Sequence, residues 1–193
     1  MKKLTRTDLM SLEQYAEKRA AFRAEVIAHK KNRQIPLGPN ATLYFEDRLT
    51  VQYQIQEMLR IERIFEVAGI EEELEAYNPL IPEGSNWKAT FMIEFPDPEE
   101  RKDWLTRLRG VDRKVWVQVG DFGRVSPITN EDLERETEDK TAAVHFMRFE
   151  LTADMVTAAR DGAAILMGID HPEYRYSLNL SAAQCQALVA DLG

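Results

Sequence analysis

The densest group of polar residues in the chain is Asp170-His171-Pro172-Glu173. Carboxylates and imidazoles bind divalent metal ions, and a turn between two strands would hold such side chains close together. Their spacing matches no known metal-binding signature, and turns that contain proline are commonly polar because water surrounds them. Asp170, His171 and Glu173 are therefore candidate ligands for a metal ion or a small molecule. A solvated turn is the competing interpretation.

His145 is a second candidate for chemistry, and it lies on the apolar side of a predicted strand over residues 142–151. A lone histidine in such a position is usually a hydrogen-bonded core residue. It could act as an acid–base group or a metal ligand if a carboxylate faced it, and Glu62 is the residue we consider for that role. No pattern in the sequence brings these two residues together.

Glu62 interrupts the apolar stripe of a predicted helix that begins after Asp47 and ends near Gly69. It has no lysine or arginine at helical-neighbour spacing, whereas Glu57 has Arg60 three residues further on. A carboxylate buried without a partner is unstable or takes up a proton. Glu62 therefore needs a partner from elsewhere, unless it is simply exposed.

Arg19 interrupts the stripe of the preceding helix, predicted over residues 5–31, in the same way. If the two helices are antiparallel, Arg19 falls within about one turn of Glu62, and Tyr15 can donate its hydroxyl beside them. We predict a structural ion pair between Arg19 and Glu62 that fixes the register of the hairpin. A carboxylate at a ligand or metal site is the alternative role for Glu62.

The order of helix and strand patterns predicts an α+β protein that positions these residues. Residues 1–84 form a predicted antiparallel helical hairpin with its connection, and residues 85–193 form a sheet region. The hairpin is expected to pack on a mainly antiparallel sheet of about five strands, in one compact unit. Two or three further helices follow, with capping residues at Asp97, Thr152 and Ser181.

Two segments of the sheet region repeat one order of elements. The segments that start at Phe91 and Phe146 each run from a strand through a capped helix and a glycine to an apolar strand. Beyond a shared Phe-Met pair their identity is slight. Internal duplication is therefore a hypothesis.

Composition narrows the class of protein. The 193 residues are 44% hydrophobic and 30% charged, as in a globular domain. Residues 1–34 carry nine basic and four acidic residues (net +5), and the rest carries 16 and 29 (net −13). The acidic body and the absence of a nucleic-acid motif argue against nucleic acid as a partner.

Residues 130–140 hold six acids and two bases and predict a solvated helix or loop.

No run of apolar residues is long enough for a membrane span, and no signal peptide is recognisable. We therefore expect a cytoplasmic protein with no membrane partner. The single cysteine, Cys185, excludes an intramolecular disulfide and a multi-cysteine metal site within one chain. The sequence indicates no cofactor, and it leaves homo-oligomerisation open.

A mixed polar face on the predicted sheet is a candidate surface for a partner or a shallow ligand groove. Its candidate partner-surface residues are Trp116, Arg148 and Arg175. The competing interpretation is that the helical hairpin covers this face.

Several segments spread over nearly the whole chain resemble one bacterial family, domain of unknown function 3501. They are "LGPNATLYFEDRLTVQYQIQEMLRIERI", "AYNPLIP", "ATFMIEFPD", "VHFMRFEL" and "DHPEYRYSLNL". The resemblance supplies no catalytic or binding residues. It implies a genomic context, because such proteins are often encoded beside rubrerythrin-like and iron–sulfur proteins, and hence an accessory role in redox or peroxide defence.

Two functions remain from the sequence. The first is a non-catalytic accessory protein that binds a protein partner, such as a rubrerythrin-like or iron–sulfur protein. The second is a metal- or ligand-dependent enzyme that draws on a carboxylate and histidine pool of Glu62, His145, Asp170, His171 and Glu173.

Overall fold

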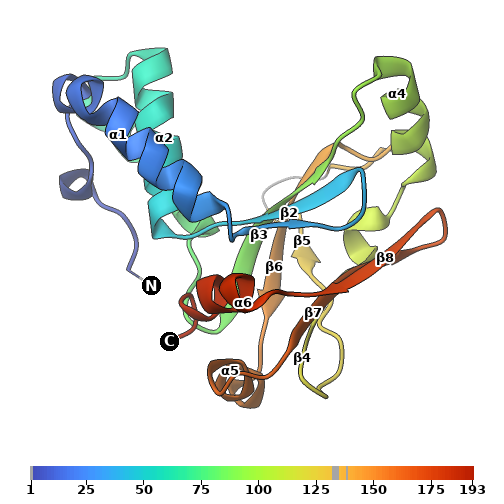
Figure 1. Ribbon diagram of the computed structural model, residues 1–193. Coiled ribbons are helices and arrows are strands. Elements are labelled where there is room, and N and C mark those ends of the chain that lie inside the picture. Colours follow the sequence, from blue (N-terminus) through green and yellow to red (C-terminus); the bar gives the residue numbers. More distant parts are fainter. Residues whose placement is uncertain (1, 132–134, 138) are drawn as a thin grey trace.

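The computed structural model describes residues 2–131, 135–137 and 139–193. A helical hairpin projects from one end of the strands, and smaller helices lie around the rest (Figure 1). The helix or loop predicted over residues 130–140 falls partly outside the described residues. No helix in the described part of the chain combines the length and apolar character needed to cross a membrane.

The hairpin consists of α1 (Leu12–Lys30) and α2 (Arg48–Glu62). Between them the chain forms β1 (Gln34–Pro36) and β2 (Ala41–Phe45), so the base of the hairpin is joined directly to a sheet. The predicted cap of α2 is confirmed, because the Asp47 carboxylate accepts a hydrogen bond from the amide of Thr50. The first helix is shorter than predicted, since a separate 3-10 turn, η1 (Arg6–Asp8), precedes it.

The second predicted helix ends earlier than Gly69. Arg63 has a left-handed backbone with φ 55°, which stops the hydrogen-bond ladder of α2 at Glu62. A new helix, α3 (Val67–Tyr77), follows, and then the 3-10 turn η2 (Asn78–Leu80). Gly69, in the first turn of α3, allows close packing, because a Cβ there would lie 2.7 Å from Cγ2 of Ile64.

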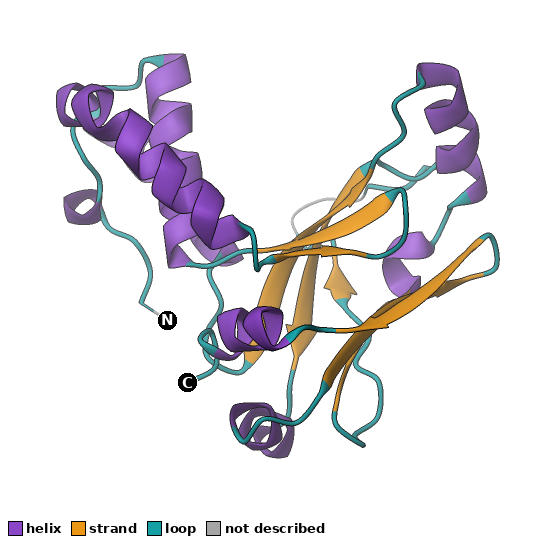
Figure 2. Ribbon diagram, viewed as in Figure 1, coloured by secondary structure: helices purple, strands orange, loops and turns teal. Residues whose placement is uncertain are grey.

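The strands form two antiparallel sheets, shown in orange in Figure 2. The larger sheet has the order β1-β2-β3-β6-β5, and the smaller has the order β4-β7-β8. The strands not yet given are β3 (Asn86–Ile93), β4 (Val115–Val119), β5 (Ile128–Thr129), β6 (Val144–Glu150), β7 (Ile165–His171) and β8 (Tyr174–Asn179). The predicted α+β class is confirmed, while the single sheet of about five strands is divided into two.

The repeat seen in the sequence has a counterpart in this division. The first copy runs from β3 through α4 (Pro98–Arg107) and η3 (Val111–Lys114) to β4, and the second runs from β6 through α5 (Ala153–Arg160) to β7. The first strands of the two copies pair in the larger sheet, and the second strands pair in the smaller one. Each copy therefore contributes one strand to each sheet, in equivalent antiparallel pairs.

Buried apolar residues form two clusters. The larger cluster is shared by both sheets and by α6 (Ala182–Val189), which Ser181 caps as predicted. The smaller cluster belongs to the helical part and joins α2 to α3 and to the N-terminal segment through Val51, Ile55 and Leu59. The domain boundary predicted at residue 84 stays a prediction, and across it β2 pairs with β3.

Candidate functional site

The three candidate ligands of the β7–β8 turn face different partners. Asp170 forms an ion pair with Arg124, and Glu173 forms one with Arg107. Arg107 also donates hydrogen bonds to the Glu173 carboxylate, and they hold the pKa of Glu173 below its usual value. Because both carboxylates are bound to arginines, they are not arranged around a common ion. Nowhere in the described ranges do three histidine, cysteine or carboxylate side chains gather as they would around a metal.

His171, in the same turn, is buried and holds the backbone in place. Its Nε2 lies 3.0 Å from the carbonyl oxygen of Arg109, to which it donates. Its Nδ1 lies 3.2 Å from the amide nitrogen of Glu173, from which it accepts. Both ring nitrogens are thus used by the backbone, which suits a structural residue.

His145 is a fully buried histidine of β6, as the core interpretation requires. Its Nδ1 accepts a hydrogen bond from the side-chain amide of Asn130 at 3.2 Å. Its Nε2 lies 3.0 Å from the Thr141 hydroxyl and 3.0 Å from the Ala142 carbonyl oxygen. Burial lowers the pKa of His145, although the Asp112 carboxylate acts to raise it. The imidazole is therefore a neutral, internally hydrogen-bonded group.

The carboxylate near His145 is Asp112 rather than Glu62. Asp112 is buried in η3, and its Oδ2 accepts from the Thr129 hydroxyl at 2.9 Å and from the Asn130 amide at 3.3 Å. Glu62 is instead an exposed residue in the last turn of α2. Sequence reasoning missed Asp112 because it is a single acid in a charged turn, with no pattern that marks it as buried.

The ion pair predicted for Arg19 has a different partner. Nε of Arg19 lies 2.7 Å from Oε1 of Glu57 and Nη2 lies 2.8 Å from Oε2, which makes a two-pronged pair. The Tyr15 hydroxyl donates to the same carboxylate at 2.6 Å. The pairing with Glu62 is corrected to Glu57, because the buried apolar stripe of α2 follows Val51, Ile55 and Leu59 instead of Met58 and Glu62. The side of α2 that meets Arg19 is therefore the one that carries Glu57.

The three residues predicted to form a partner surface do not share one sheet, because Arg148 lies on β6 of the larger sheet and the other two lie on β4 and β8 of the smaller one. Trp116 is only 5% exposed, with the guanidinium of Arg124 stacked 3.8 Å from its ring centre, so it is corrected to a buried residue. Its ring lies over Gly168 of β7, the next strand in the smaller sheet. Arg148 forms ion pairs with two glutamates of its surroundings, and Arg175 is exposed on β8.

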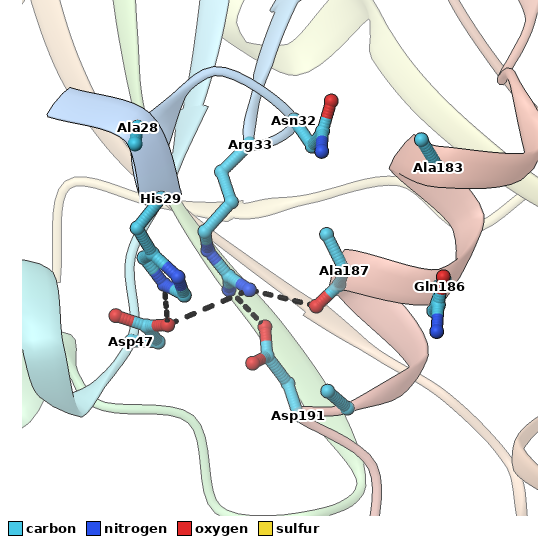
Figure 3. A pocket seen from close by; sticks show the side chains of 10 residues that line it. Ala28, His29, Asn32, Arg33, Asp47, Ala183, Gln186, Ala187 and Asp191 are labelled. Atoms are coloured by element: carbon cyan, nitrogen blue, oxygen red, sulfur yellow. Dashed lines mark hydrogen bonds and ion pairs between the residues drawn. The ribbon is translucent and has the colours of Figure 1, made fainter. Parts of the chain in front are cut away.

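A network of four charged residues ties the hairpin to the C-terminal helix at a place that the sequence analysis did not single out (Figure 3). Nε2 of His29, in the last turn of α1, lies 2.5 Å from Oδ2 of Asp47, the cap of α2. Nη1 of Arg33 lies 3.5 Å from the same Asp47 oxygen, and Nη2 of Arg33 pairs with Asp191 just beyond α6. This network could not be predicted from the sequence, because Arg33 and Asp191 are 158 residues apart.

Arg33 is fully used within this network. Its guanidinium donates to the carbonyl oxygens of Phe45, Glu46 and Ala187, in addition to its contacts with the two aspartates. Burial raises the pKa of Asp191 to about 6, against the opposing effect of Arg33. For Asp47 burial also acts to raise the pKa, but Arg33, the Thr50 amide and His29 together outweigh it and leave the pKa lowered.

The four charged residues line a cavity of about 350 Å³, which we call the hairpin-base pocket. Its remaining walls come from α1, from the turn after α1 and from α6. They are formed by Ala28, Asn32, Ala183, Gln186, Ala187 and Ala190. Arg33 and Asp191, each 2% exposed in the side chain, are the least exposed of the charged lining residues, whereas His29 is 34% exposed.

A second surface feature lies at the other end of the hairpin, where α2 turns into α3. Ile61, Phe65 and Val67 are 61%, 64% and 55% exposed, and we call these three residues the hairpin-tip patch. Six large apolar side chains of the described residues are exposed, and three of these six lie where α2 turns into α3. Such a concentration is typical of an interaction site.

Comparison with known proteins gives the same family that the sequence resembles. The chain matches the family described as protein of unknown function (DUF3501) over residues 3–192. The chain belongs to this family. A crystal structure of a protein of unknown function from Burkholderia pseudomallei K96243 is 45% identical, covers 100% of both chains and has a TM-score of 0.94. The search of curated proteins returned no match.

The similarity to the Burkholderia protein extends over the hairpin as well as the two sheets, because all of this DUF3501 chain is covered. The hairpin is thus part of the shared architecture. Neither description assigns an activity, so function must be argued from the hairpin-base pocket and the hairpin-tip patch of this DUF3501 protein.

Proposed function

We propose that this DUF3501 protein is a non-catalytic, cytoplasmic binding protein that docks a partner protein on the hairpin-tip patch. The observation that carries the proposal is the exposure of Ile61, Phe65 and Val67 in one turn at the end of the hairpin away from the sheets. Burying apolar side chains of this size is the main favourable contribution in protein association. Aromatic and large aliphatic anchors also dominate measured binding energies.

The charge around the patch favours one kind of partner. Residues 60–75 contain six glutamates and two arginines, a net charge of −4. Burial raises the pKa of Glu73, and the negative charges of Glu62 on α2 and Glu72 on α3 raise it further. The glutamates of the two helices therefore repel one another. Of the two arginines, Arg60 already contacts Glu57. An apolar centre with an acidic rim matches a partner surface that has apolar residues within a basic rim.

The same charge argues against two other occupants. A second copy of the chain docked patch to patch would bring two acidic rims together, and an anionic membrane would repel the rim as well. A rubrerythrin-like or iron–sulfur protein, the kind of partner that the family resemblance implies, is the partner we propose. Its docking face should be basic.

The alternative function, an enzyme with a carboxylate and histidine site, has less support. His145 and His171 use both ring nitrogens in internal contacts, and Asp170 and Glu173 are paired with different arginines. Glu62 is exposed on α2, in the helical part of the chain. These five residues do not converge on one reacting centre.

Titration calorimetry with a purified rubrerythrin-like or iron–sulfur protein encoded nearby tests the proposal. We expect Phe65→Ser to weaken binding about tenfold or more, because it removes an exposed aromatic anchor. Ile27→Ser is the matched control, since Ile27 is a large apolar residue that is likewise exposed, at 55%, but lies on α1. Affinity should fall as salt is raised, because the rims carry opposite charges.

Two results would overturn the proposal. Equal losses in Phe65→Ser and Ile27→Ser would show that binding does not use the hairpin-tip patch. Stoichiometric metal in protein purified without an affinity tag, lost in His171→Ala or His145→Ala, would favour the enzyme instead.

A further inference from the structure

The hairpin-base pocket has an imbalance of charge among its least exposed residues. Its lining contains two carboxylates, from Asp47 and Asp191, and one guanidinium, from Arg33. The charged groups that act on Asp191 are Arg33, Asp47 and His29. Apart from His29, these groups sum to one negative charge. A carboxylate removed from water is stable only when it is fully compensated.

Arg33 does not remove this imbalance alone. It is shared among Asp47, Asp191 and three backbone carbonyl oxygens, and those carbonyl oxygens are themselves the negative ends of dipoles. Burial raises the pKa of Asp191 even though Arg33 acts to lower it. The carboxylates would therefore gain from another positive group or hydrogen-bond donor nearby.

The walls of the pocket suit the rest of a small organic molecule. Ala183 and Ala187 of α6 and Ala190, the residue after this helix, contribute methyl groups, and Ala28 contributes another from α1. Asn32 and Gln186 add amide groups that can accept hydrogen bonds from an ammonium group. The mixture of a few polar groups and small apolar side chains in a cavity of about 350 Å³ is typical of a site for a small ligand.

We propose that the hairpin-base pocket binds a small organic cation, with its ammonium group at the Asp47 and Asp191 carboxylates and its alkyl chain against the alanines of α6. This site is separate from the hairpin-tip patch and does not depend on the proposed function.

Ligand-observed NMR with butylammonium as the probe tests the site, with butanol as its uncharged counterpart. We expect butylammonium to bind with a dissociation constant on the order of millimolar, because so few atoms supply limited binding energy. Butanol should bind about tenfold or more weakly, because it lacks the charge that the carboxylates favour. Binding should also be stronger at about pH 8 than at about pH 6, because burial raises the pKa of Asp191 to about 6 and the ionised carboxylate is the form that attracts an ammonium group.

Variants on α6 separate the pocket from the rest of the surface. Ala183→Leu places a large side chain in the cavity and should abolish butylammonium binding, while leucine still favours a helix. Ala182→Leu is the matched control, because Ala182 is an exposed neighbour on α6 that does not line the pocket. Asp191→Asn should weaken binding about tenfold, since it removes the excess negative charge.

The proposal is rejected if butanol binds as well as butylammonium, or if Ala183→Leu and Ala182→Leu bind the probe equally. Failure of the unmodified protein to bind butylammonium at either pH also rejects it.

Discussion

Arg33 and Asp191 form a buried ion pair between the base of the helical hairpin and the end of α6, with both side chains 2% exposed. The pair joins residues that are 158 positions apart. Because Arg33 also contacts Asp47 at the start of α2, one guanidinium connects three parts of the chain. The hairpin is therefore anchored to the body of the protein by charge at its base, in addition to the strands that continue from it.

Removal of the guanidinium in Arg33→Met should destabilise the protein by about 3–5 kcal/mol, because Asp191 and Asp47 would keep buried charges without their partner. Urea denaturation followed by circular dichroism measures this loss. Arg107→Met is the control: its pair with Glu173 is about half exposed and screened by water, so its loss should cost much less stability. Similar losses in the two variants would contradict the anchoring role.

The stability of the protein should depend on Asp191 between about pH 4 and pH 6. Its folded pKa of about 6 lies above the ordinary value of 3.8, so the folded state holds this proton more tightly than the unfolded state. The free energy of unfolding therefore receives a contribution that is present at low pH and is lost as pH rises through 6, by up to about 3 kcal/mol.

Denaturation of Asp191→Asn over the same pH range isolates that contribution, since the amide does not titrate. We expect its stability to be flatter than that of the natural chain between pH 4 and 6. Below this range Asp47 and Glu57, whose pKa values are lowered, make both proteins less stable as the carboxylates take up protons. An unchanged slope in Asp191→Asn would show that another group is responsible.

The Arg19–Glu57 pair should be detectable as an energetic coupling. A double-mutant cycle with Arg19→Met and Glu57→Gln is expected to give a small favourable coupling energy, because the pair is two-pronged but Arg19 is 35% exposed and screened by water. The same cycle with Glu62→Gln is the control and should give additive effects. Coupling to Glu62 instead would restore the pairing predicted from the sequence.

Gly168 leaves room for the ring of Trp116, so we expect this glycine to be required for the stability of the protein. A Cβ at this position would lie 2.4 Å from Cζ2 of Trp116 and 2.6 Å from the Tyr176 carbonyl oxygen. Gly168→Ala is therefore expected to destabilise the protein by about 1–3 kcal/mol or more, measured as the free energy of unfolding. Gly123→Ala is the control, because no atom lies within 4 Å of a Cβ there.

Local features of the site elements could be predicted, and partners across the chain could not. The caps at Asp47, Asp97, Thr152 and Ser181 are read from a few adjacent residues, and all four accept the hydrogen bonds expected of them. Arg19 was correctly expected to pair across the hairpin, but with the wrong glutamate. Two apolar stripes of α2 that differ by one residue position give similar patterns in the sequence, but they point toward different neighbouring helices.

The candidate ligands show the same limit. The polarity of the β7–β8 turn and the apolar surroundings of His145 were evident, yet the arginines that occupy Asp170 and Glu173 come from distant segments. Asp191 lies at the end of an apolar helix and carried no signal of burial. Its importance depends on Arg33, which the folding of β1 and β2 brings to it.

Hydrophobic periodicity and capping act between residues close together in the chain, so the α+β class, the capped helices and the repeated order of strand and helix can be predicted from the amino-acid sequence. The folded chain is needed to see how the strands divide into two sheets, which carboxylate each arginine neutralises and where the hairpin-base pocket opens. Those outcomes depend on burial and charge pairing between segments that are adjacent only after folding.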